Sequence, residues 1–146
     1  MSAEIETKPS ILFWIIAGLF ILWGLMGCGI YLADKFMTDA NLLEARGQEA
    51  LDARHAYPIW ASAAYGIAVW VGLLAAILMI LRKKLSIPLF VVSLIAAVIC
   101  FIPTFTDPIF KEAGGAYYWV MPLIVVTIGI FEIIFSRKQQ AKGVLR

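Results

Sequence analysis

The sequence predicts an all-α membrane protein, a four-transmembrane-helix bundle with a short amphipathic helix in its first outer loop. Of the 146 residues, 62% are apolar and only 15% are charged, whereas soluble domains are close to half apolar and a quarter charged. The charges are also clustered, and four long runs between them are nearly free of charge. Each of these runs is close to the roughly 20 residues that a helix needs to cross a bilayer.

The four apolar runs define a single membrane domain over residues 1–146. We expect transmembrane helices at residues 11–32, 58–81, 87–105 and 117–135, an outer loop at 33–57 and a tail at 136–146. Helices are expected because they satisfy every backbone hydrogen bond internally, as hydrocarbon requires. The link from Arg82 to Ser86 is so short that the second and third helices must be antiparallel neighbours.

The orientation follows from the Lys and Arg residues that flank the predicted helices. Eight of them lie in the two terminal tails and in the link between the second and third helices, and four lie in the other two loops. Because basic residues are retained on the cytoplasmic side, both termini are expected in the cytoplasm.

The first outer loop carries a helical pattern. Small or apolar residues share one face of this helix: Leu43, Gly47, Ala50 and Leu51. Polar residues lie opposite them, and Thr38 is suited to cap the N-terminus. We therefore expect a surface helix over residues 38–54, with its apolar face against the bundle or the lipid headgroups.

Short motifs along the last two thirds of the chain resemble a known family. They are Pro58-Ile59-Trp60, Ala68-Val69-Trp70 with Gly72, Leu81-Arg82-Lys83-Lys84, Pro88-Leu89-Phe90 with Ser93-Leu94, and Gly143-Val144-Leu145-Arg146. With them the chain resembles small bacterial four-helix inner-membrane proteins that are often labelled sugar transporters. The resemblance implies a bacterial inner membrane, crossed several times, and transport of a small solute. Members tend to carry Asn and Asp where this chain has Gly24 and Ile30, so the resemblance implies the architecture more strongly than the transport.

Glu132 is the one ionisable residue inside a predicted span. A charge in the bilayer is costly and usually faces protein or water, which makes Glu132 a candidate for coupling a proton or ion to function. It also lies about one turn from the cytoplasmic end of its helix. There it could instead reach the interface, or pair with Arg82, Lys83 or Arg137.

A second candidate site lies in the outer leaflet, where two predicted helices carry Pro103 and Pro122. Proline frees a carbonyl in the preceding turn, and polar groups lie nearby. These polar residues are Thr104, Thr106, Asp107 and Thr127. One interpretation is a small polar pocket with the first loop as its lid, and the other is prolines that only tilt their helices.

Four glycines thin one side of the first helix, namely Gly18, Gly24, Gly27 and Gly29. Small residues let helices approach closely in a membrane, so these glycines predict packing within the bundle or contact with a second copy. Cys28 and Cys100 lie at nearly equal depth in the outer leaflet, and we expect both thiols to be buried and unbonded. Leu25-Met26-Gly27-Cys28 loosely resembles a lipoprotein cleavage box, but the apolar run continues past it, as in an uncleaved anchor.

No pattern of residues indicates an enzyme, a metal site or a bound cofactor. His55 is the only histidine, and neither zinc nor haem is held by one histidine without further ligands. No nucleophile stands in a pattern with a base, and no basic stripe suggests nucleic acid. The composition favours a non-catalytic accessory or scaffolding protein, packed in the lipid bilayer against itself or a larger membrane complex. The alternative is a small homo-oligomeric transporter, which a wet cavity reaching the middle of the bilayer would favour.

Overall fold

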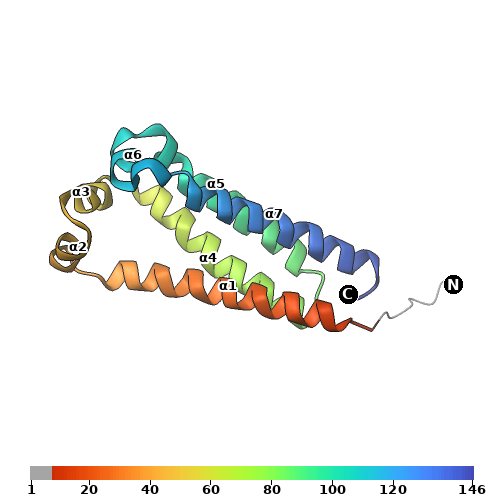
Figure 1. Cartoon of the computed structure of the whole chain (residues 1–146). Coiled ribbons are helices and arrows are strands. Elements are labelled where there is room, and N and C mark those ends of the chain that lie inside the picture. The colour runs from red at the N-terminus through yellow and green to blue at the C-terminus, as the bar shows by residue number, and fades with distance from the viewer. Residues whose placement is uncertain (1–7) are drawn as a thin grey trace.

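Four long helices lie side by side in the computed structural model, which describes residues 8–146 (Figure 1). Residues 1–7, part of the predicted cytoplasmic tail, lie outside the described residues. The long helices are α1 (Ile11–Phe36), α4 (Ile59–Ile80), α5 (Ser86–Thr106) and α7 (Val120–Ala141). Each is long and apolar enough to cross a membrane. The predicted all-α fold with four membrane-spanning helices is confirmed.

The observed helices differ from the predicted ones mainly where α7 begins and where α1 and α7 end. The helix α7 begins at Val120 rather than at Tyr117, because the short α6 (Pro108–Gly114) and the turn η1 (Gly115–Tyr117) precede it. Gly115 allows this turn, since its φ of 64° is unfavourable for other residues. At the other end, α7 continues to Ala141 because the tail has no helix breaker before Gly143.

The predicted surface helix is present as two helices, α2 (Asp39–Arg46) and α3 (Gln48–Ala56), which we call the cap. Thr38 begins α2 as predicted, with its Oγ1 accepting a hydrogen bond from the Asn41 amide at 3.2 Å. Gly47 separates the two helices with a φ of 87°. A helix cannot continue through that conformation, which glycine adopts without steric cost, so the chain turns at Gly47.

The long helices pack in the order α1, α4, α5, α7, so that α4 lies between α1 and α5. Figure 1 shows α1 running apart from α5 and α7 toward the end that carries the cap. At the opposite end, aromatic rings join them. The Phe20 ring of α1 lies 5.8 Å from the rings of Phe131 and Phe135 on α7 and 6.0 Å from that of Phe90 on α5. The bundle is therefore tightly closed at one end only.

The closed end, which we call the tail end, is sealed by the end of the chain. Val144 and Leu145 are 2% and 4% exposed and belong to the main core cluster with Phe20. The backbone of Arg146 forms two hydrogen bonds with the link between α4 and α5. Its amide donates to the Arg82 carbonyl, and its carbonyl accepts from the Lys84 amide, each at 3.0 Å. Two segments that the family resemblance singled out separately thus form one structural unit.

Candidate functional site

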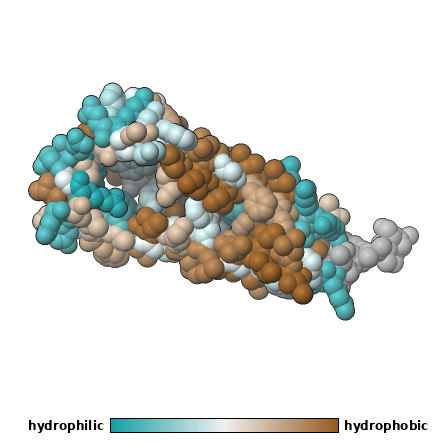
Figure 2. Space-filling model, viewed as in Figure 1, coloured by the Kyte–Doolittle hydropathy of each residue, from teal (hydrophilic) through white to brown (hydrophobic). Residues whose placement is uncertain are grey.

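A cavity of about 820 Å³ lies between the cap and the four long helices. Figure 2 shows the molecule hollowed beside the cap, with hydrophilic residues around the cap and mostly hydrophobic ones along the helices. Every long helix contributes to the lining, and so do α2, α3 and α6. Because this space reaches from the cap into the bundle and is lined mostly by apolar residues with a few charged ones, it is the candidate functional site.

Charged side chains line the cap end of the cavity, which we call the mouth. They are Asp34, Lys35, Arg46 and Arg54. Arg54 holds the cap against α1, because its Nη2 donates to the Asp34 carbonyl at 3.0 Å while its Nη1 lies 3.6 Å from the Asp39 carboxylate. His55 reaches the same carboxylate, at 2.8 Å. These contacts fold α3 back onto α2 and the end of α1.

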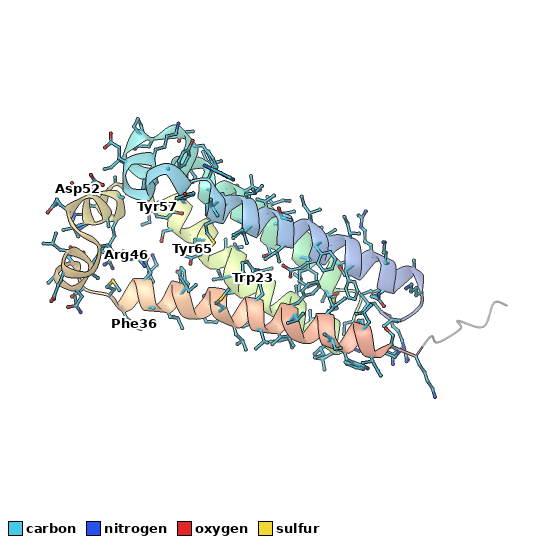
Figure 3. The ribbon with its side chains drawn as sticks, viewed as in Figure 1. Trp23, Phe36, Arg46, Asp52, Tyr57 and Tyr65 are labelled. Atoms are coloured by element: carbon cyan, nitrogen blue, oxygen red, sulfur yellow. The ribbon has the colours of Figure 1, made fainter. Side chains whose placement is uncertain are left out.

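The two other cations of the mouth differ in their surroundings. Lys35 donates a hydrogen bond to the Ser62 hydroxyl on α4, and its Nζ lies 5.3 Å from the centre of the Tyr31 ring. Arg46 takes part in no ion pair among residues 8–146. Figure 3 places Arg46 on the side of the cap that faces the bundle, and Asp52 on the opposite side.

Of the predicted apolar face of the cap only Ala50 lines the cavity, and Leu43 is 42% exposed, because the chain turns at Gly47. Leu42 and Ala53 are buried instead, and the inward face of the cap includes a cation.

Aromatic side chains follow the wall of the cavity from the mouth inward. Figure 3 shows Tyr57, Tyr65 and Trp23 in succession between α1 and α4. The Tyr57 hydroxyl donates to the Cys100 carbonyl on α5 at 2.8 Å. Because this side chain is half-buried and lies outside the spans, desolvation raises the pKa of Tyr57 above its ordinary value of 10.0. It therefore stays a neutral donor that ties the cap to α5.

Small residues make room for the cavity and bring its helices together. A Cβ added at Gly72 would lie 2.8 Å from the Ser93 Oγ, and one at Gly129 would lie 2.7 Å from the Leu94 Cδ1. Ser93 in turn donates to the Ala68 carbonyl at 2.6 Å, which ties α5 to α4. Close packing of the cavity wall therefore favours glycine at these positions.

Glu132 lines the cavity at its deepest point, toward the tail end. The residue is 7% exposed and takes part in no ion pair among residues 8–146. The sequence allowed two structural interpretations of Glu132, exposure at the interface and pairing with a nearby cation. Neither describes this position. An ionised carboxylate without a cation is costly in such a place, which is the usual signature of a functional group in a membrane.

The predicted outer-leaflet residues lie away from the cavity. None of Pro103, Thr104, Thr106, Asp107, Pro122 and Thr127 lines it. Thr106 and Thr127 donate to carbonyls of their own helices, those of Ile102 at 3.0 Å and Leu123 at 2.7 Å. Their hydroxyls are thus satisfied locally and are not gathered into a pocket.

Pro103 and Pro122 occupy unlike positions. Both are buried, but Pro103 lies inside α5, whereas Pro122 lies in the first turn of α7, where no intrahelical amide bond is lost. Thr106 and Pro122 border a second hollow of about 260 Å³, whose other lining residues are apolar. Asp107 caps α6, since its Oδ1 accepts from the Ile109 amide at 3.1 Å. The first loop covers a cavity, as expected for a lid, but this is the cavity that Glu132 lines and not a pocket around the two prolines.

The cysteines and glycines of the helices separate into two groups. Both cysteines are buried and free. The Cys28 thiol donates to the Val69 carbonyl at 3.4 Å, while Cys100 lines the cavity and donates to the Ala97 carbonyl at 3.0 Å. Gly24 and Gly27 face α4, but a Cβ at Gly18 or Gly29 would meet nothing within 4 Å. Packing within the bundle accounts for two of the four glycines.

The mouth and the aromatic wall were not singled out from the sequence, although a signal exists. Ala50, Ala53, Arg54 and Tyr57 follow one helical face, and all of them line the cavity.

No family model, curated protein or solved structure matches this chain. No group of three or more potential metal ligands occurs among residues 8–146.

Proposed function

We propose that this chain is a multi-pass protein of a bacterial inner membrane that binds a small solute within the bilayer and transports it. The observation that carries the proposal is the cavity of about 820 Å³ that extends from the charged mouth to Glu132. Small-molecule sites are typically mostly apolar spaces of about 300–1,000 Å³ with a few polar groups. A protein that only packs against partners needs no internal space of this kind.

The charge distribution supports an outward-facing arrangement of this cavity. Both described chain ends lie at the tail end, which carries the larger share of Lys and Arg, so the cap faces the outer side under the positive-inside rule. The mouth then opens outward, and the residues of the tail end close the cytoplasmic side. Transport requires a second arrangement in which the tail end opens.

Cysteine accessibility tests the proposal. In a background with Cys28→Ala and Cys100→Ala, Ser93→Cys places a thiol on the cavity wall, with roughly 10 Å of helix rise between it and the start of α5. Val92→Cys is the matched control, because Val92 is adjacent, 45% exposed and outside the cavity lining. A charged, membrane-impermeant methanethiosulfonate is added to right-side-out or to inside-out vesicles.

We expect Ser93→Cys to react from the outer side much faster than Val92→Cys, because only the cavity brings water to a thiol at that depth. Slower reaction of the same thiol in inside-out vesicles would show access from the cytoplasmic side, as transport requires. If Ser93→Cys reacts no faster than Val92→Cys from either side, the space is not open to water and the proposal fails.

A second candidate, the accessory or scaffolding role, is favoured by the outward face of α1. Gly18 and Gly29 lie on it with open space around them, beside the exposed Leu22 and Leu25. Such a face can receive a helix of a second copy or of another protein. Isolation in mild detergent, followed by identification of copurifying proteins and by the native mass, distinguishes a stable complex from a protein that works alone.

A further inference from the structure

Charged groups line the cavity mainly at its mouth. Three cations and one carboxylate lie there, whereas Glu132 is the ionisable residue at the deep end. Between them the wall is mostly apolar and aromatic. An anion is therefore attracted at the mouth, and an apolar body is accommodated deeper in the cavity.

Arg46 is the cation of the mouth that is best placed to receive an anion. Lys35 is engaged with Ser62 and the Tyr31 ring, and Arg54 with the Asp34 carbonyl and Asp39. Arg46 has no such ion pair and lines the cavity from the end of α2. A guanidinium offers several donors in a fixed geometry that matches phosphate and carboxylate oxygens.

The cavity also opens sideways, between α1 and α7. These two helices are joined near the tail end by aromatic side chains, and they lack close backbone packing toward the cap. Figure 2, viewed across the helices, shows the hollow from the side. Met26 and Ile30 of α1 line one edge and Met121 of α7 lines the other. All three belong to apolar spans, so this opening faces lipid.

We propose that the substrate is a lipid with an anionic headgroup, which enters from the outer leaflet between α1 and α7. Its phosphate or carboxylate binds Arg46 at the mouth, and its acyl chain lies along the wall toward Glu132. The lining of α1 from Phe20 to Ala33 corresponds to roughly 20 Å of helix rise, enough for a long acyl chain. The inference rests on the proposed function and names the substrate class of the same cavity.

Protection of the Ser93→Cys thiol tests the inference on the purified full chain in maltoside detergent, again with Cys28→Ala and Cys100→Ala. The rate of methanethiosulfonate modification is measured with dodecyl phosphate, with dodecylphosphocholine or with inorganic phosphate. The first two share one chain and differ in headgroup charge, and the third lacks a chain. Each rate is divided by the rate of Val92→Cys measured with the same additive, so that effects on the reagent itself cancel.

We expect dodecyl phosphate to protect at about tenfold lower concentration than dodecylphosphocholine, the difference that one charge-assisted contact makes. Arg46→Gln should abolish this preference, while Arg46→Lys should retain part of it. Equal protection by both amphiphiles, or an unchanged preference in Arg46→Gln, overturns the anionic headgroup. Protection by inorganic phosphate at equal concentration overturns the lipid in favour of a soluble anion. Absence of modification without additive instead refutes the proposed function.

Discussion

The ring cluster around Phe20 provides the sharpest test of how α1 is held in the bundle. Its ring contacts those of Phe90, Phe131 and Phe135 at 5.8–6.0 Å, in edge-on geometries. In water, Phe→Ala in a core costs about 3–5 kcal/mol, part of which is transfer out of solvent. That part is small in a bilayer, since lipid is as apolar as the core.

What remains for Phe20→Ala is packing and ring interaction. Each aromatic contact is worth about 0.5–1.5 kcal/mol beyond burial, so three of them predict a loss of about 1.5–4.5 kcal/mol. The assay is unfolding of the purified protein by sodium dodecyl sulfate, followed by circular dichroism. Phe36→Ala is the control, because Phe36 lies on the same helix and is 81% exposed.

The ring cluster also forms the wall at the deep end of the cavity. Phe20 and Phe90 both line that end, so Phe20→Ala should enlarge the cavity and raise the reactivity of Ser93→Cys. If Phe20→Ala and Phe36→Ala unfold at the same detergent concentration, the rings do not hold α1 to α7, and the reasoning is refuted.

Four further results are expected. Reporter fusions at Gln48 and at the C-terminus should report opposite sides of the membrane, and one shared side would contradict the four-span topology. Alkylation without reductant should modify both cysteines, and a mass that shows an internal disulfide would contradict two free thiols. Glu132→Gln should not lower stability in the detergent titration, because the Glu132 carboxyl group has no cation partner to lose. A loss beyond about 1 kcal/mol would show that this group is structurally paired. Tyr57→Phe should cost about 0.5–1.5 kcal/mol at neutral pH through its bond to the Cys100 carbonyl. Because the folded-state pKa of Tyr57 is raised, its contribution is complete below pH 10.0 and is lost as pH rises further, so Tyr57→Phe should flatten that alkaline decline.

The sequence alone determined the elements that depend on local chemistry. Hydrocarbon demands a helix of a certain length and apolarity, so the four spans follow from counting. The N-cap at Thr38 and the helical character of the first loop follow from side-chain type and spacing. The break between α2 and α3 lies at Gly47, a residue type that disfavours the interior of a helix.

Only the tertiary structure decided which faces meet. A soluble helix shows its core face by its apolar stripe, but a membrane helix is apolar toward both protein and lipid, so periodicity does not distinguish them. Glu132 could be noticed as a lone charge, yet its place at the end of a cavity depends on helices that are distant in sequence. The same holds for Arg46, which lines the cavity together with residues of all four long helices.

The tail end illustrates the same limit. Arg82 and Val144 lie in separate motifs, and no local pattern indicates that the Arg82 Nε donates to the Val144 carbonyl at 3.0 Å. The contact forms because α5 and α7 return the chain to the link after crossing the bundle twice. Backbone groups at the end of a chain bond to whatever the fold brings beside them, and that choice belongs to the packing of the whole bundle.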